Sequence, residues 1–500
     1  MYHRLQISPK PATADARAAG VLKQATTFLR LPVENVCRRD VYSLFVDCDE
    51  AAAQEIVDAF TNTVTEDGIR GETSPHTAFD WLVVVGFRPG VTDNIARSAR
   101  SAIADILGRP LDDRENVFTS AEYFIAGAKL SRTDVEHLAE DLLANTLIQT
   151  TVVMAAAEYG QHGAPVNNPV VTDSSEPTVQ TIDLQVSDDD LLRISREGVL
   201  ALTLPEMKAI QAYFRKHAPA RRKAGLTAEP TDVELECIAQ TWSEHCKHKI
   251  FNARIEYTDE TGDTRTIDSC FKTFVKRSTE AIAGDTDWLV SVFHDNAGVI
   301  RFNDRLNVVY KVETHNSPTA LDPYGGAITG IVGVNRDPLG TGLGADLLLN
   351  TWGYCFASPF TPAEDVPEDL FHPRRLRNGV HQGVIDGGNQ SGIPYAAGWE
   401  YFDQRFLGKP LVYCGTVGTL PREIQGHPAH EKDIQPGDYV VMIGGRIGKD
   451  GIHGATFSSE ELHGESPSQA VQIGDPITQR LVKDFLMEAR ERYLYRFITD

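Results

Sequence analysis

The sequence predicts an α/β (α+β) protein built from several domains in series. Residues 1–155 read as an imperfect repeat of strand and helix units, in which Glu34-Asn35-Val36 recurs as Glu115-Asn116-Val117. Residues from about 231 to 420 alternate strands with loops rich in glycine and proline. A length of 500 residues fits two to four domains. We expect boundaries that give domains at 1–160, 161–230, 231–424 and 425–500.

The repeat is defined by matching elements in its two copies. The first copy is expected to contain a strand at 3–8, a helix at 14–29, two short strands at 33–47 and a helix at 50–64. The second is expected to contain a strand at 79–89, a helix at 92–107, strand residues at 116–128 and a helix at 133–145. Two such units should pair their sheets so that each buries one face.

The connector at 161–230 is punctuated by Pro, Asn and Ser, which mark loops. Asp188-Asp189-Asp190 is expected to cap a short helix, and Leu202–Phe214 is expected to form another. The basic cluster from Arg215 to Lys223 is interpreted as a solvated linker, with a docking patch as the alternative.

A helix is predicted at the start of the large domain. Thr231 and Glu234 form a capping box. The apolar residues that follow have helical spacing. This helix would carry His245 near its C-terminal end. A histidine beside an apolar face is commonly a hydrogen-bonded core residue, and that alternative stays open. Cys246 has no second cysteine at zinc-like spacing, which argues against a zinc site.

A strand ending in a loop is predicted further on, where Leu306, Val308 and Tyr310 alternate with other residues. Glu313 and Asp337 are hard oxygen ligands of the kind that Mg²⁺ prefers, and Lys311 can meet a phosphate. Seven glycines lie between residues 325 and 344. They predict a loop whose backbone amides close on an anion. The alternative is an ordinary glycine-rich turn with a hydrogen-bonded His315.

The last domain is expected to begin with a turn at Pro436-Gly437-Asp438 and a buried strand at Tyr439–Ile443. Neither a dinucleotide-binding GxGxxG fingerprint nor a P-loop lysine motif is present in the sequence.

Composition limits the function classes. The net charge of −22 disfavours binding to nucleic acid or to an anionic membrane. The sequence contains no run of 18 apolar residues, so no transmembrane helix is predicted. Seven scattered cysteines favour free thiols in a reducing cytoplasm. We therefore expect a cytoplasmic protein without nucleic-acid or membrane partners.

Six ordered motifs between residues 200 and 500 resemble phosphoribosylformylglycinamidine synthase, the ATP-dependent amidotransferase of purine biosynthesis. They are WSEHC with KHKIF, KVETHNSPTA, GGAITGIVGVNRD, GNQSGIP (388–394), GKDGIHGATFSS (448–459) and AVQIGDP (470–476). The segment VVVGFRPGVTDNIARSARSAIADILG also resembles the small accessory subunit of the multi-subunit form.

The resemblance implies an architecture of tandem ferredoxin-like accessory domains and a linker. An N-terminal domain like that of aminoimidazole ribonucleotide (AIR) synthetase would follow, with an incomplete C-terminal domain after it. The chain would be the N-terminal part of a longer polypeptide and inactive by itself. A second synthetase half and a glutaminase domain or subunit that supplies ammonia would be its partners.

The resemblance also assigns roles to single residues. Ser317 departs from the family's commoner histidine, and His248 stands where the multi-subunit form usually has an aromatic residue. The implied sets are catalytic His245 and His315; substrate-binding Thr314, Asn316, Ser317, Arg336 and Gln472; ATP-binding His248 and Lys311; and the Mg²⁺ ligands Glu313, Asp337 and Asp500.

The implied reaction is amidation of formylglycinamide ribonucleotide, in which ATP activates the amide oxygen and ammonia displaces phosphate. Two alternatives remain. One is a different ATP-dependent enzyme of the same superfamily, such as a thiamine-phosphate kinase or a selenide-activating enzyme. The other is a non-catalytic nucleotide-binding or assembly subunit, which would not need both histidines and three carboxylates.

Overall fold

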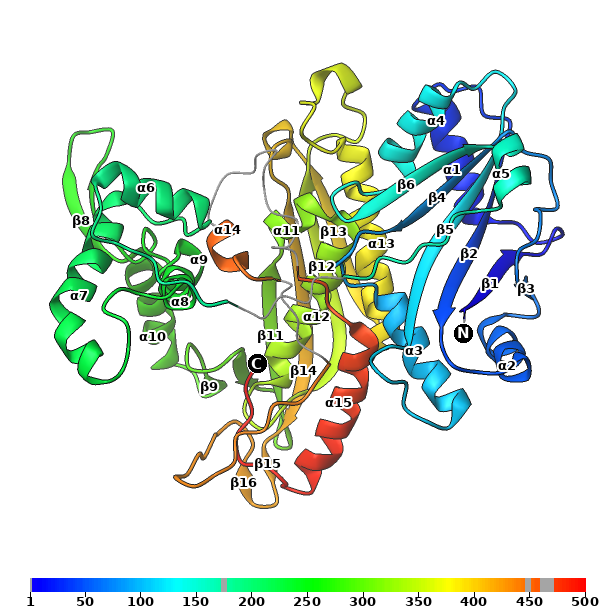
Figure 1. The fold of residues 1–500 in the computed structure, drawn as a ribbon. Coiled ribbons are helices and arrows are strands. Elements are labelled where there is room, and N and C mark those ends of the chain that lie inside the picture. Colours follow the sequence, from blue (N-terminus) through cyan, green and yellow to red (C-terminus); the bar gives the residue numbers. More distant parts are fainter. Residues whose placement is uncertain (1, 172–177, 446–450, 459–471) are drawn as a thin grey trace. The chain divides into compact units, whose positions relative to one another are not determined.

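The computed structural model describes residues 2–171, 178–445, 451–458 and 472–500, and it divides into two compact units. The units are Met1–Ser174 and Ser175–Asp500 (Figure 1). The finer boundaries at 161, 231 and 425 stay predictions.

The first unit contains one six-stranded sheet with strand order β3-β1-β2-β5-β4-β6. Its two halves have the same element order, β-α-β-α-β, with one π-helical turn in the second. The elements are β1 Tyr2–Pro9, α1 Ala16–Thr27, β2 Asn35–Phe45, α2 Glu50–Phe60 and β3 Glu66–Arg70, then β4 Trp81–Phe87, α3 Asn94–Leu107, β5 Asn116–Ala126, α4 Arg132–Leu138, η1 Ala139–Leu143 and β6 Gln149–Ala155. Helix α5 (Ala156–His162) follows.

The two halves meet at the antiparallel pair β2 and β5, where Asn35 pairs with Ala126 and Phe45 with Asn116. The predicted repeat thus forms one continuous sheet. The expectation of two short strands at 33–47 is wrong, because β2 runs unbroken beside β5 and both edges of the strand are paired. Strands β3 and β6 and helix α5 were not predicted.

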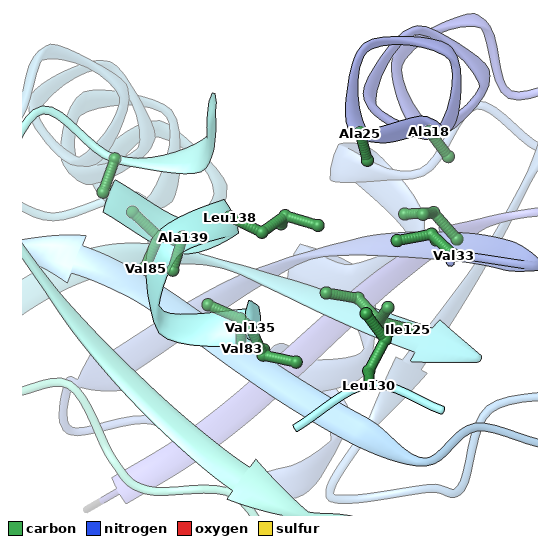
Figure 2. Packing of buried hydrophobic residues seen from close by; sticks show 12 residues of the cluster. Ala18, Ala25, Val33, Val83, Val85, Ile125, Leu130, Val135, Leu138 and Ala139 are labelled. Atoms are coloured by element: carbon green, nitrogen blue, oxygen red, sulfur yellow. The ribbon is translucent and has the colours of Figure 1, made fainter. Parts of the chain in front are cut away.

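Helices α1 to α4 cover one face of this sheet. Small residues of α1 and larger ones of α4 pack onto Val83, Val85 and Ile125, which alternate with residues of the other face (Figure 2). A second cluster joins α2 and α3 to Leu5, Leu44 and Val117. The apolar alternation of the strands therefore fixes which face the helices cover.

The other face of the sheet holds a buried ionic cluster. Glu122 is fully buried, and its two carboxylate oxygens accept hydrogen bonds from Arg4 and from Arg39. Arg39 also donates to the carbonyl of Thr73 and to the hydroxyl of Tyr159. Burying charges in this way requires that they be paired and hydrogen-bonded.

The second unit begins with a helical layer. It comprises α6 Asp188–Glu197, α7 Leu204–Lys223, α8 Asp232–Thr241 and α9 Glu244–Lys247. Ser187, and not the three aspartates, caps α6. The basic cluster lies within α7, where Arg215, Lys216, Arg222 and Lys223 are exposed, as expected for a solvated segment, and Arg221 pairs with Glu234 at 2.8 Å.

A six-stranded mixed sheet follows in the same unit, with strand order β13-β12-β14-β11-β10-β9. Helices α12 and α13 pack on one of its faces through Tyr354, Phe356 and Val412 (Figure 1). The strands are β9 Leu289–Ser291, β10 Gly298–Arg301, β11 Leu306–Thr314, β12 Asp346–Phe356, β13 Tyr395–Phe402 and β14 Leu411–Pro421. The helices are α11 Asn316–Leu321, α12 Pro323–Leu339 and α13 Pro373–Ser391.

Smaller elements complete the unit. They are the hairpin β7 Arg254–Thr258 and β8 Thr264–Asp268, the π-helical turn η2 Phe271–Lys276, α10 Arg277–Ala283, the 3-10 turns η3 Ala363–Asp365 and η4 Gln404–Phe406, the pair β15 Glu423–Ile424 and β16 His427–Pro428, α14 Gly454–Phe457 and α15 Pro476–Glu491. Among the described residues, no helix combines the length and apolar character needed to cross a membrane.

Two further predictions are wrong, one for residues 325–344 and one for Tyr439–Ile443. The glycine-rich loop is the buried helix α12, in which Gly325, Gly326 and Gly330 allow close packing against neighbouring segments. Tyr439–Ile443 is not a buried strand: Tyr439 and Val440 are 96% and 95% exposed, and no strand is assigned there. A strand needs a partner to satisfy its backbone, and the described residues supply none at this place.

Candidate functional site

His245 lies on its own short helix. The predicted single helix ends at Thr241, and the chain bends at Trp242 before Ser243 caps α9 through the backbone N–H of Cys246. His245 therefore sits in the first turn of α9 instead of at the end of a longer helix. Desolvation lowers the pKa of the His245 imidazole, the nearby His248 lowers it further, and the carboxylate of Glu313 opposes both.

His315 is held at the junction of β11 and α11. Its Nδ1 lies 2.6 Å from the carbonyl oxygen of Gly326, and its backbone N–H bonds to Val412. A carbonyl only accepts, so Nδ1 carries the proton and Nε2 keeps a free electron pair. Burial lowers the pKa of His315 to about 4, which keeps the ring neutral near pH 7.

Gly330 makes room for this ring. A Cβ atom at residue 330 would lie 3.1 Å from the sulfur of Cys414 and 3.2 Å from the Cβ of His315. The glycine in α12 therefore serves close side-chain packing, and the anion-binding loop that the glycine run predicts is not formed.

The two histidines line one pocket of about 290 Å³. Six of the predicted site residues lie around it: His245, Thr314, His315, Asn316, Ser317 and Gln472. The remaining lining residues are Pro318, Lys409, Gly451, Gly454, Ala455 and Ser458. A larger hollow of about 440 Å³ in the first unit is lined by none of the predicted residues.

Several pocket residues also hold the backbone. The side-chain oxygen of Asn316 accepts a hydrogen bond from the backbone N–H of Val412 at 2.8 Å, which fixes the start of α11 against β14. Ser317 is only 2% exposed. The carbonyl of Gln472 accepts from Thr329, which anchors the chain before α15 to helix α12. The pocket wall is therefore assembled from segments far apart in the sequence.

Charged groups gather beside the pocket around Lys311. Its ammonium lies 2.8 Å from Glu313 and 3.8 Å from Asp337, and it donates to the carbonyl of Asn296. Burial raises the pKa of Asp337 to about 6, and the carboxylates of Asp500 and Glu313 add to the increase while Lys311 opposes it. The structure thus brings Lys311 and the three predicted acidic residues into one electrostatic cluster.

Arg336 joins this cluster through Asp500, whose carboxylate accepts from Nε at 2.5 Å. The donor set suits a hard cation, because carboxylate oxygens are the ligands Mg²⁺ prefers and their mutual repulsion would be relieved by it. As the side chains stand, however, no group of three or more potential ligand side chains within the described ranges is arranged to hold a metal ion. Lys311 and Arg336 contact the carboxylates instead.

The places of His248 and Lys409 relative to the pocket do not follow from the local sequence. His248 ends α9 in the left-handed region with φ 53°, and it does not line the pocket. Lys409 does line the pocket, and burial lowers the pKa of its ammonium. It lies outside the quoted motifs, between Gly408 and Pro410, so no local pattern marks it.

Two family models match the second unit. Residues 191–249 match the formylglycinamide ribonucleotide amidotransferase linker domain. Residues 294–420 match the AIR synthase related protein, N-terminal domain. The second match covers strands β10 to β14 of the sheet and the helices α11 to α13, so it confirms the AIR synthase-like part of the expected fold. The ferredoxin-like assignment of residues 1–160 stays a prediction.

Curated relatives carry the name phosphoribosylformylglycinamidine synthase subunit PurL. The protein from Thermoplasma acidophilum is 35% identical over 324 residues, which cover 64% of this chain and 38% of the relative. The protein from Thermoplasma volcanium is 33% identical over 317 residues, covering 63% and 37%. The predicted resemblance to the synthase is thereby confirmed, and the chain spans less than two-fifths of the length of these relatives.

A solved structure described as T. maritima PurL complexed with FGAR has 28% sequence identity to the chain. The match covers 56% of this chain and 37% of that one, with a TM-score of 0.39. This score is too low for the match to bear on the arrangement of the elements.

Proposed function

We propose that this chain carries one synthetase half of phosphoribosylformylglycinamidine synthase and takes part in ATP-dependent amidation of formylglycinamide ribonucleotide. The observation that supports this most strongly is the pocket that gathers two imidazoles beside a cluster of three carboxylates and a lysine. Relatives named as subunits of this synthase are 35% and 33% identical to the chain over 324 and 317 residues.

The chemistry explains the need for such a site. An amide oxygen is a poor leaving group, so ATP transfers its γ-phosphoryl group to that oxygen and leaves ADP. Ammonia then attacks the resulting iminophosphate carbon, and the C–O bond breaks to release inorganic phosphate and the amidine. Phosphoryl transfer depends mainly on positioning and on charge stabilisation.

His315 suits the role of proton acceptor. With Nδ1 bonded to Gly326, its Nε2 can accept a proton from the substrate amide nitrogen as the oxygen is phosphorylated, or from the attacking ammonia. His245 lines the same pocket and would orient the amide or receive a proton in turn. Thr314, Asn316, Ser317 and Gln472 would contact the substrate from the pocket wall, and Arg336 from its edge.

The charged cluster would hold the nucleotide. Glu313, Asp337 and Asp500 would bind Mg²⁺, which neutralises phosphate charge and aligns the transferring group. Lys311 would turn from the carboxylates toward a phosphate, and His248 would contact the nucleotide from the end of α9. The binding of Mg²⁺ therefore requires that Lys311 and Arg336 give up their present contacts.

A second synthetase half would cover the open face of the second sheet. Helices occupy one face, whereas Tyr310, Val312, Trp399 and Tyr401 on the other are 46–51% exposed. Tyr310 approaches Thr351 and Trp399 approaches Tyr413, so these side chains share one face across four strands. Exposed aromatic surface of this kind marks an interface. A glutaminase domain or subunit would supply ammonia in the cytoplasm.

The decisive experiment uses the complete polypeptide with formylglycinamide ribonucleotide, ATP and an ammonium salt. His315→Ala and Glu313→Ala should each lower turnover by about 100-fold or more, because they remove a proton acceptor and a charge-stabilising ligand. His162→Ala, an exposed histidine in the first unit, is the matched control. Normal turnover in either site variant would overturn the assignment. Absence of turnover in the wild type would favour an assembly subunit.

A further inference from the structure

A short glycine-containing segment, residues 451–458, closes one side of the site pocket. Gly451, Gly454, Ala455 and Ser458 line the pocket together with the two histidines. Within this segment, α14 (Gly454–Phe457) contacts both α8 and α9. The segment therefore touches the pair of helices that carries His245.

One close polar contact joins the segment to α8. Nδ1 of His453 lies 3.0 Å from Oε1 of Glu236, and the two side chains are only 34% and 19% exposed. Nδ1 makes no hydrogen bond within the described residues, so the pair is a close polar contact that becomes an ion pair when the imidazole is protonated. Gln240, one turn along α8, donates to the same carboxylate oxygen at 2.6 Å and holds it in place.

The other end of the segment is attached elsewhere. Nζ of Lys409 donates to the carbonyl oxygen of Ser458 at 3.4 Å, and Lys409 also lines the pocket. His453 itself lies in the left-handed region with φ 68°, where the chain turns into α14. The segment thus spans the pocket from Glu236 in the middle of α8 to Lys409, which precedes β14.

We propose that Glu236 and His453 are positioning residues for the pocket, an inference that rests on the proposed function. Their contact docks residues 451–458 onto α8, which leads directly through Trp242 and Ser243 to His245. The spacing between the glycine wall and His245 is then set by this contact. Neither residue lines the pocket, so both act through the segment between them and the ligand.

The first test measures hydrogen exchange of the amides at 451–458 in the chain itself. Glu236→Gln removes the charge, and His453→Asn keeps a residue that tolerates the left-handed region. Each should speed exchange there by about 2- to 5-fold, the range expected for a partly exposed charge contact. The double variant should exchange no faster than the single ones, because both remove the same contact. Glu488→Gln, which breaks an exposed pair on α15, should leave these amides unchanged.

The second test measures steady-state kinetics of the complete polypeptide. Both single variants should raise KM for the ribonucleotide by about 2- to 5-fold and change kcat less, because binding and not the chemical groups is altered. Wild-type exchange in both variants, or effects that multiply in the double variant, would overturn the proposal. A wild-type protein that fails to convert the ribonucleotide would sink the proposed function alone, since the exchange comparison would still decide the contact.

Discussion

The two units of the chain contain charged clusters of opposite character. In the first unit, fully buried Glu122 accepts hydrogen bonds from Arg4 and Arg39, which are 7% and 3% exposed. In the second unit, Lys311 and Arg336 face three carboxylates, and the side chains are between 16% and 48% exposed.

The first cluster stabilises the fold, whereas the second has the character of a functional site. The carboxylate of Glu122 is bonded on both oxygens, so the cluster holds strands β1, β2 and β5 together. The cluster around Lys311 keeps one more acidic group than basic groups. Burial raises the pKa of Asp337, and the carboxylates of Asp500 and Glu313 add to the increase. A cluster with an excess of carboxylates and a raised pKa that stays accessible to ligands is typical of a functional site.

The largest effect is expected from breaking the buried cluster around Glu122. Glu122→Ala leaves two guanidinium groups buried without their carboxylate, which should lower the free energy of unfolding by about 3–5 kcal/mol. Denaturant-dependent hydrogen exchange of the β5 amides measures this. Asp141→Asn, which breaks an exposed pair with His137, should change it by less than about 1 kcal/mol. A loss below about 1 kcal/mol in Glu122→Ala would contradict the structural role.

Removing a carboxylate from the cluster around Lys311 should have a different effect. Asp337→Asn removes one carboxylate from a partly exposed cluster that has more acidic than basic groups, so the free energy of unfolding should change by less than about 1 kcal/mol. Turnover of the complete protein should nevertheless fall by about 100-fold or more. The two quantities are measured on the same preparation by denaturation and by steady-state assay. Equal losses in both would remove the distinction between the clusters.

A smaller effect is expected from two glycines of the same helix. Gly330→Ala would press on His315 and Cys414, whereas Gly333→Ala has no neighbour closer than Arg336 at 4.0 Å. Alanine favours a helix over glycine by up to about 1 kcal/mol, so Gly333→Ala should be neutral or stabilising. Gly330→Ala should lower turnover while Gly333→Ala does not. Identical kinetics in both variants would show that the glycine does not make room for His315.

The last prediction concerns the acid stability of the first unit. The guanidinium of Arg109 and the backbone N–H groups of Asp47 and Asp112 hold the pKa of Glu115 down at about 2. A lowered pKa in the folded state gives stability that is complete above the ordinary value near 4.5 and is lost as the pH falls toward about 2. Glu115→Gln should flatten this part of the stability–pH curve, measured by hydrogen exchange of neighbouring strand amides. An unchanged curve would contradict the assignment.

Local patterns predicted the repeat, the capping box at Thr231 and most elements, because hydrophobic alternation and caps are local signals. They failed where contacts between residues distant in the sequence determine the local structure. The glycines of α12 predict a loop because glycine has a low helix propensity. The helix forms because close packing against His315 and Thr319 outweighs that propensity. Tyr439–Ile443 has strand composition but no strand partner within the described residues.

The site was predictable to a similar degree. Motifs named six of the pocket residues and the acidic cluster, because their chemistry is concentrated in short segments. Lys409 and the contact between Glu236 and His453 could not be found, since they join segments that are distant in sequence. The buried pair of Arg4 and Glu122 spans 118 positions and was missed for the same reason.

The most direct test follows the amide oxygen of the substrate. Formylglycinamide ribonucleotide labelled with ¹⁸O at that amide is converted by the complete protein with ATP and ammonia, and the released phosphate is examined by mass spectrometry. The proposed chemistry predicts that the label appears in inorganic phosphate, and that Glu313→Ala slows its appearance. Label found in water, or retained in the nucleotide product, would contradict activation of the amide oxygen by phosphoryl transfer at this site.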